Sequence, residues 1–318
     1  MNPHYNQPAP NSGDAPFFDI QVNGFAGVDF QDAEMSQAEL RRAVDSLLRH
    51  RTGGILLTLI TDRLDAMEHK LALVERYRAA DPVIAAVIVG YHLEGPHLSP
   101  FPGFHGAHPA ELMSPPDCVA FDRMQAAANG RIRLVTIAPE LPGSAEYIAH
   151  VVAAGVRVAI GHSNASDGDI DSAIAAGLTL CTHLGNGVPM ELARHDNIIQ
   201  RLLARDELVA SFIADGLHVP PGALRNFVRA KPKGKVIFTT DCMSAAGAGS
   251  GRFRIGRLEI EVGDDGVVRE PGKPNFAGSS LTMDRAASNV AEWLGWTQEE
   301  TATACGNRAR AAVGLPGV

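Results

Sequence analysis

The sequence has a deficit of basic charge and lacks any long hydrophobic run. Its 28 Lys and Arg residues stand against 36 Asp and Glu residues, which gives a formal net charge of −8. A groove for nucleic acid normally needs a basic stripe, and none is found here. No apolar run approaches the roughly 20 residues that cross a bilayer. We therefore expect neither nucleic acid nor a membrane among the partners of this chain.

Cysteines are also scarce. The four of them are far apart and include no CxxC pair, which argues against a disulfide framework or a structural zinc knuckle. Residues 1–16 are polar and rich in Pro and Asn, and they lack the apolar segment of a signal peptide. We interpret them as a flexible lead-in, and we expect a cytoplasmic protein.

The composition is that of an ordinary globular protein, because 45% of the 318 residues are hydrophobic and 20% are charged, and it excludes a disordered or collagen-like chain. Apolar runs rich in β-branched residues recur between stretches with helical spacing, and helix starts are indicated at Ser36, Asp167 and Pro220–Pro221. Eight runs are predicted to be strands: Phe17–Val22, Gly54–Ile60, Val83–Tyr91, Ile132–Ala138, Val156–Ile160, Leu178–Cys181, Leu208–Ala214 and Val236–Thr240.

Eight strands that alternate with helices predict a (β/α)8 TIM barrel, formed by residues 17–318 as one catalytic domain. The alternative is a doubly wound open sheet, but no GxGxxG follows the first strand. Residues 245–276 break the pattern with two alternating runs, Arg252–Ile255 and Leu258–Val262, and a turn at Asp264-Asp265-Gly266. We expect a β-hairpin there, and then two closing helices around Leu281–Leu294 and Gln298–Val313.

Chemistry in such a barrel is built at the carboxyl ends of the strands. Glu94, His162 and His183 fall at the ends of the third, fifth and sixth predicted strands. Two imidazoles and one carboxylate suit a divalent metal such as Zn²⁺, with a position left for water. Asp241, at the end of the eighth strand, would lie across the barrel mouth and take a proton from that water.

A single histidine at the end of an apolar strand is more often a packed core or loop residue than a ligand. Several ionisable groups at successive strand ends are harder to explain as packing, because burying them without a partner would cost several kcal/mol. For Gln21 and Asn23 alone, a role in turn formation is the simpler interpretation.

Several motifs together resemble the N-acetylglucosamine-6-phosphate deacetylases of the amidohydrolase superfamily. They follow the family order over almost the whole chain, and their combination is far more specific than any one of them. The matching segments are Phe18–Gly24 with Gly27–Phe30, His92–Pro96, Gly106–His108, Gly161–Ala165, Thr182–Leu184 with Asn186, Ile213–Val219, Thr240–Asp241 and Gly278–Met283.

The resemblance implies that Glu94, His162 and His183 bind the metal and that Asp241 is the catalytic acid and base. His108 would contact the sugar and polarise the acetyl carbonyl. Gln21 and Asn23 occupy the position where the wider superfamily has a His-x-His pair. The resemblance therefore points to one divalent ion, with Zn²⁺ expected and Fe²⁺ or another divalent ion as alternatives.

The same resemblance implies that Asn186, Gly187, His218 and Arg194 contact the substrate phosphate. In the family, the residue matching Arg194 reaches across from the partner subunit, which implies a homodimer. The chain has only sixteen residues before the first strand, so we expect the family's small β-sandwich to be absent. The segment 101–105 and the neighbours of Arg194 also differ from the family pattern.

The resemblance predicts hydrolysis of N-acetylglucosamine-6-phosphate to glucosamine-6-phosphate and acetate. One alternative is a deacetylase of another, unphosphorylated N-acetyl amino sugar. A second is a non-catalytic sugar-binding barrel, and a third is another metal amidohydrolase, for example one that cleaves a cyclic amide.

Overall fold

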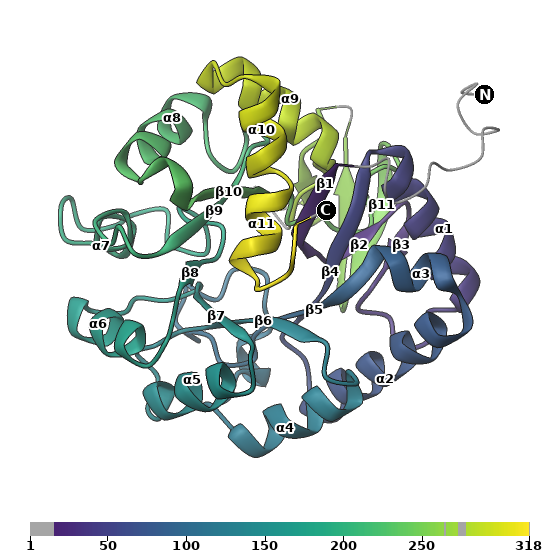
Figure 1. Ribbon diagram of the computed structural model, residues 1–318, viewed down its shortest axis with the longest axis horizontal. Helices are drawn as coiled ribbons and strands as arrows, with labels where there is room; N and C mark the ends of the chain where they lie inside the picture. The colour runs from purple at the N-terminus through teal and green to yellow at the C-terminus, as the bar shows by residue number, and fades with distance from the viewer. Residues whose placement is uncertain (1–15, 264, 273–277, 318) are drawn as a thin grey trace.

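A computed structural model describes residues 16–263, 265–272 and 278–317 of the chain. The predicted lead-in therefore falls, apart from Pro16, outside the described residues. Eight parallel strands form one sheet that curls into a nearly closed barrel, and helices surround it (Figure 1). The strands, in spatial order, are β1 (Phe17–Val22), β4 (Thr52–Ile60), β5 (Ile88–Glu94), β6 (Ile132–Ile137), β7 (Arg157–Ile160), β8 (Leu180–Cys181), β9 (Val209–Ile213) and β10 (Val236–Thr239). This arrangement confirms the predicted (β/α)8 barrel.

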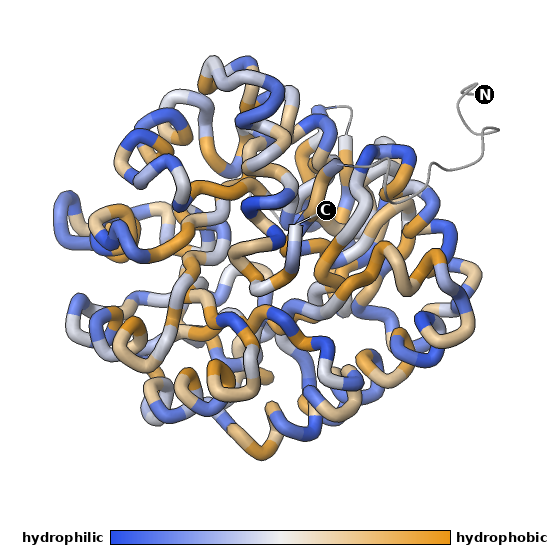
Figure 2. Tube along the Cα trace, in the orientation of Figure 1, coloured by the Kyte–Doolittle hydropathy of each residue, from blue (hydrophilic) through white to orange (hydrophobic). Residues whose placement is uncertain are grey.

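The helices pack their apolar sides on the barrel and present polar sides outward, as the hydropathy colours show (Figure 2). Ser36 caps the first helix through a capping box with Glu39, and the helix buries Leu40, Val44 and Leu47. The helices are α1 (Gln37–Arg49), α2 (Leu64–Ala80), α3 (Pro82–Val87), α4 (Cys118–Ala127), α5 (Ser144–Ala153), α6 (Asp167–Ala175), α7 (Ile198–Leu203), α8 (Pro221–Ala230), α9 (Met283–Leu294), α10 (Gln298–Ala304) and α11 (Asn307–Ala312).

Two predicted elements differ from the structure. The first half of the predicted strand Val83–Tyr91 is the helix α3, because the Asp81 side chain accepts hydrogen bonds from the backbone N–H groups of Val83 and Ile84 and Pro82 begins the helix. The predicted helix Gln298–Val313 is divided into α10 and α11 at Gly306. A Cβ atom there would lie 2.5 Å from the Pro16 carbonyl oxygen, so the chain turns where only glycine fits against the start of β1.

One buried carboxylate contributes several of the hydrogen bonds that close the seam between β1 and β10. Asp19 is buried, and its carboxylate accepts hydrogen bonds from the hydroxyl groups of Thr239 and Thr240, both at 2.5 Å, and from the Thr240 backbone N–H. An isolated parallel bridge between Val22 and Cys242 follows, at the carboxyl end of the seam. A carboxylate thus supplies acceptors that a backbone ladder supplies elsewhere in the sheet.

The predicted hairpin is present and has a third strand. β11 (Gly251–Ile255), β12 (Leu258–Val262) and β13 (Val268–Arg269) form a separate antiparallel sheet. The Gly266 N–H donates to the Gly263 carbonyl at the predicted turn, while Asp264 and residues 273–276 of the insertion lie outside the described residues. Short two-residue strands β2 (Gly24–Phe25) and β3 (Val28–Asp29) follow β1. Among the described residues, no helix is both long and apolar enough to cross a membrane.

Candidate metal and catalytic centre

Three buried side chains from neighbouring strand ends meet at the mouth of the barrel. Glu94 is the last residue of β5, while His162 and His183 follow the ends of β7 and β8 by two residues. One ligand atom of each lies within 4.8 Å of the others. Their exposed fractions are 2%, 7% and 2%, so a cation held there would be largely shielded from water. The structure thus brings together the three residues in which the sequence predicts a metal site.

The hydrogen bonds around these three residues suit a divalent metal. His162 Nδ1 lies 2.7 Å from the Phe104 carbonyl oxygen and must donate to it, which leaves Nε2 to face the group. His183 Nε2 is 2.9 Å and His162 Nε2 is 3.4 Å from Glu94 Oε1. Burial opposes ionisation of Glu94, but the neighbouring imidazoles of His108, His162 and His183 outweigh it and hold the pKa of Glu94 well below its ordinary value. An anionic carboxylate and two imidazoles form a donor set typical of Zn²⁺.

The backbone is strained after three of the strands around the site, β7, β8 and β10. His162, His183 and Asp241 adopt φ angles of 51°, 30° and 49°, in the left-handed region that residues other than glycine rarely occupy. Such conformations cost about 1–3 kcal/mol each and persist where the surrounding structure enforces them, most often at functional sites. These left-handed residues turn the chain directly after each strand, so the side chains of His162, His183 and Asp241 lie at the mouth of the barrel.

Asp241 is held by the two amides at the end of β1. Gln21 Nε2 lies 2.9 Å and Asn23 Nδ2 2.8 Å from the same oxygen, Asp241 Oδ1. Gln21 Nε2 also donates to Glu94 Oε1, at 2.8 Å. The two amides therefore act as hydrogen-bond donors to the carboxylates, and their nitrogen atoms cannot be metal ligands.

Burial, helped by the negative charge of Glu94, raises the pKa of Asp241 to about 6. A carboxylate with such a pKa is ionised at neutral pH and still accepts a proton readily, as a general base must. His108 lies beside the same group, with its Nε2 3.5 Å from Glu94 Oε2 and its ring 4.6 Å from the ring of His162. Burial lowers the pKa of His108, which favours its neutral form.

A cavity of about 580 Å³ opens above these groups. Its lining includes Glu94, His108, His162, His183 and Asp241, and also Asn23, Asn186, Gly187 and His218. Four of the five predicted substrate-binding residues, His108, Asn186, Gly187 and His218, therefore line the same cavity. Arg194 is exposed and is not among the residues that line this cavity.

The loop after β9 holds His218 rigidly. Asp215 Oδ1 accepts hydrogen bonds from the backbone N–H groups of Leu217 and His218, both at 2.8 Å, and Asp215 Oδ2 lies 2.6 Å from His218 Nδ1. Asp215 belongs to the segment Ile213–Val219 that carries the family resemblance, but no role was predicted for it. An Asp three residues before a His, directly after a strand, was the available signal.

A nearly closed (β/α)8 barrel whose strand ends join Glu, two His and an Asp defines a metal-dependent amidohydrolase. No family model matches the chain, but individual relatives do. N-acetylglucosamine-6-phosphate deacetylase of Bos taurus is 35% identical over 309 residues, which cover 94% of this chain and 74% of the relative. N-acetylgalactosamine-6-phosphate deacetylase of Escherichia coli O157:H7 is 31% identical over 89% of this chain and 73% of the relative.

A solved structure agrees with these relatives. A mutant of N-acetyl-D-glucosamine-6-phosphate deacetylase from Mycobacterium smegmatis, in complex with N-acetyl-D-glucosamine-6-phosphate, has a TM-score of 0.84 and 31% identity, over 95% of this chain and 77% of that one. The chain belongs to the N-acetylglucosamine-6-phosphate deacetylase family.

Proposed function

We propose that this chain hydrolyses the acetamide bond of N-acetylglucosamine-6-phosphate and releases glucosamine-6-phosphate and acetate. The observation that carries the proposal is the convergence of Glu94, His162 and His183 with Asp241 and His108 on one cavity. A metal-binding group, a base and a hydrogen-bond donor within one space are the parts that amide hydrolysis requires. Family membership supports the choice of an amino-sugar phosphate as substrate.

Glu94, His162 and His183 would hold one divalent ion, with Zn²⁺ the best fit to their chemistry and Fe²⁺ or another divalent ion as alternatives. Such an ion supplies a Lewis acid that lowers the pKa of water and polarises a carbonyl. Gln21 and Asn23 direct N–H donors at Asp241, which supports a site for one ion rather than two.

Asp241 would carry the proton through the reaction. Its Oδ1 is occupied by the Gln21 and Asn23 amides, so Oδ2 remains to take a proton from the attacking water. The same carboxyl group then gives that proton to the sugar nitrogen as the C–N bond breaks. His108 would donate a hydrogen bond to the acetyl oxygen while negative charge accumulates on it.

Asn186, Gly187 and His218 would bind the phosphate, and Arg194 would reach the phosphate of the partner subunit in a homodimer. The exposure of Arg194 and its position outside the cavity of its own chain support this arrangement. A guanidinium offers the two-pronged contact that a phosphate dianion favours. We also infer a cytoplasmic enzyme whose residues 17–318 form one catalytic domain.

The test combines metal analysis with acetate release. We expect one divalent ion per chain and rapid acetate release from N-acetylglucosamine-6-phosphate, with much slower release from unphosphorylated N-acetylglucosamine. N-acetylgalactosamine-6-phosphate belongs in the panel because a relative is named for that epimer. Binding of the sugars without acetate release by the metal-loaded protein would instead support a sugar-binding barrel.

A further inference from the structure

The residue after β4 makes two contacts with the ring of His108. The Thr61 hydroxyl lies 2.9 Å from His108 Nδ1, and the Thr61 backbone nitrogen lies 3.3 Å from the same atom. Thr61 and His108 are 3% and 6% exposed. A backbone N–H can only donate, so it must face the lone pair of Nδ1 rather than a second hydrogen. The proton of the neutral ring is therefore on Nε2.

His162 has the opposite arrangement. Its Nδ1 faces the Phe104 carbonyl oxygen, which can only accept, so the proton of the neutral ring is on Nδ1 and the lone pair is on Nε2. The rings of His108 and His162 lie edge to face, 4.6 Å apart. The hydrogen-bond partners of their Nδ1 atoms thus give the two adjacent imidazoles different tautomers. His162 can bind a metal through Nε2, whereas His108 presents an N–H at Nε2.

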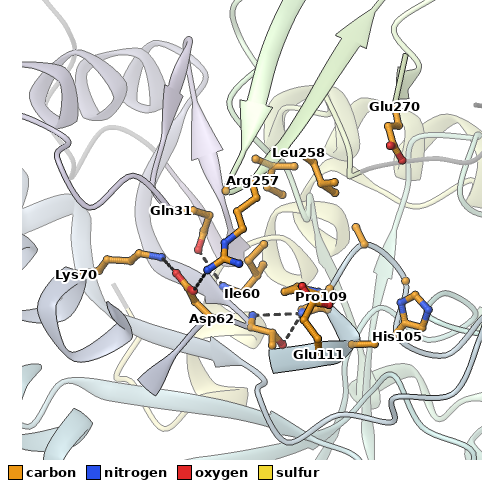
Figure 3. Close-up of a pocket in the computed structure, with 17 residues that line it drawn as sticks. Gln31, Ile60, Asp62, Lys70, His105, Pro109, Glu111, Arg257, Leu258 and Glu270 are labelled. Atoms are coloured by element: carbon orange, nitrogen blue, oxygen red, sulfur yellow. Dashed lines mark hydrogen bonds and ion pairs between the residues drawn. The ribbon is translucent and has the colours of Figure 1, made fainter. Parts of the chain in front are cut away.

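The strand end that carries Thr61 is held on both sides, next to a second cavity of about 480 Å³ (Figure 3). On one side, the Ile60 N–H donates to Gln31 Oε1 at 3.1 Å. On the other, Asp62 accepts from the buried Lys70 at 2.7 Å and lies 3.5 Å from Arg257 of the hairpin. Thr61 therefore has little freedom to move away from the His108 ring.

We propose that Thr61 is a positioning residue that fixes the ring of His108 with its proton on Nε2, the nitrogen that lies 3.5 Å from Glu94 Oε2 in a ring that lines the cavity, so that this N–H is available to the reacting acetyl group. The inference rests on the proposed function, because it deepens the role of His108 in amide hydrolysis. A ring with the other tautomer would turn a lone pair toward an oxygen that is gaining negative charge, and would repel it. Thr61 itself does not touch the substrate.

The position of the proton is measured without any reaction. Histidine side chains are labelled with ¹⁵N in protein loaded with diamagnetic Zn²⁺, and the His108 signals are identified by their loss in His108→Ala. We expect Nδ1 of His108 to resonate as an unprotonated, hydrogen-bonded nitrogen and Nε2 as a protonated one. A protonated Nδ1 in the wild-type protein overturns the proposal.

The consequence for catalysis is measured with Thr61→Val, which removes the hydroxyl and keeps the backbone N–H. We expect kcat to fall about tenfold while KM stays within about threefold, because the hydroxyl helps to hold the His108 ring whose Nε2–H acts on the transition state. Thr61→Ser restores the hydroxyl and should recover kcat to within about twofold of wild type. The matched control is Thr58→Val, three residues earlier on β4, whose buried hydroxyl bonds to Val22 and Leu56 and not to His108.

Equal kcat values for Thr61→Val and Thr58→Val would reduce Thr61 to a structural residue and overturn the proposal. Failure of the proposed function is distinguishable, since in that case the wild-type protein releases no acetate from any sugar of the panel. The NMR measurement then still shows whether His108 has the tautomer that the Thr61 contacts require.

Discussion

Two amide side chains hold one oxygen of Asp241 and leave the other for proton transfer. Gln21 and Asn23 each donate to Oδ1, and Gln21 joins that oxygen to Glu94 through a single nitrogen. The Gln21 amide thereby links Asp241, the proposed acid and base, to Glu94, a proposed metal ligand. Replacing Asp241 by Asn keeps the size of the side chain and removes its ability to accept a proton.

We expect Asp241→Asn to lower kcat by about 10²-fold or more, because general acid–base catalysis contributes about that much. The metal content should remain that of the wild-type protein, since Asp241 is not in the Glu94, His162 and His183 group. Steady-state acetate release and metal analysis of the same preparation test both statements. Wild-type turnover in a metal-replete variant would remove Asp241 from the mechanism.

The absence of a side chain at Gly187 leaves space for the His162 ring. A Cβ atom at Gly187 would lie 2.8 Å from His162 Nδ1, and the residue has a φ angle of 64°. We expect Gly187→Ala to weaken metal binding about tenfold, because it displaces the ring of His162, a proposed metal ligand that the Phe104 carbonyl orients. Metal titration measures this, with Gly222→Ala as the control, since a Cβ there meets nothing within 4 Å. Equal metal affinities in the two variants would contradict the expectation.

Among the elements, β1 and β10 depend on a buried charge. Asp19 accepts two hydroxyl and two backbone donors, from Thr239, Thr240 and Gln21. Burial nevertheless raises the pKa of Asp19 from 3.8 to about 6, because it outweighs these hydrogen bonds. The folded protein therefore binds a proton at Asp19 at a higher pH than the unfolded chain does.

The sign of the pH effect follows from that difference. As pH falls from about 6 toward 4, Asp19 is protonated in the folded state first, so its contribution to the free energy of unfolding increases, by up to about 3 kcal/mol. Asp19→Asn cannot gain this contribution. We expect the free energy of unfolding of wild type, minus that of Asp19→Asn, to increase as the pH is lowered from 7.5 to 4.5. Urea unfolding of both proteins measures this difference. A difference that is constant with pH would show that Asp19 has an ordinary pKa.

The pattern of apolar runs was sufficient to predict the barrel, since buried parallel strands are continuous and β-branched. It failed at residues 82–87, where Asp81 and Pro82 provide a cap and a first turn that start a helix within an equally apolar segment. Apolar composition alone does not distinguish these two structures. The division at Gly306 depends on an approach to Pro16, a contact between distant parts of the chain that no local pattern contains.

For the site, position at a strand end was a sufficient signal for Glu94, His162, His183 and Asp241, which the structure places around one cavity. The contacts of Thr61 with His108 could not be predicted, because a threonine at a strand end is common and its partner is 47 residues away. The role of Asp19 in the seam was missed for a similar reason. Its partners lie 220 and 221 residues further along the chain.

For the whole molecule, the proposed dimer predicts that two variants with different defects complement one another. In a mixed dimer of Arg194→Ala and Asp241→Asn subunits, the site with the intact Asp241 receives the intact Arg194 from its partner. Random association makes half of the dimers mixed, so about a quarter of all sites should be fully active. Co-expression of the two variants and assay of kcat/KM on the phosphorylated sugar measure this fraction. If Arg194 instead contacts the phosphate bound to its own subunit, co-expression will give no higher kcat/KM than the two variants give separately.

Arg194→Ala alone should raise KM for N-acetylglucosamine-6-phosphate at least about tenfold, because a charge-assisted contact with the phosphate is lost. Activity on the unphosphorylated sugar should hardly change. Analytical ultracentrifugation of the variant shows whether it still forms dimers. An equal loss on both sugars would mean that Arg194 supports the assembly rather than the substrate.

The seam between β1 and β10 also sets a delay during synthesis. Asp19 leaves the ribosome 221 residues before Thr240, which at about 5–20 residues per second means about 10–45 s without its partners on β10 and just after it. Throughout that interval the growing sheet has an open edge, and the apolar face that later becomes the barrel lining is uncovered. The nascent chain is therefore a natural client for chaperones, and slower translation would prolong its exposure to aggregation.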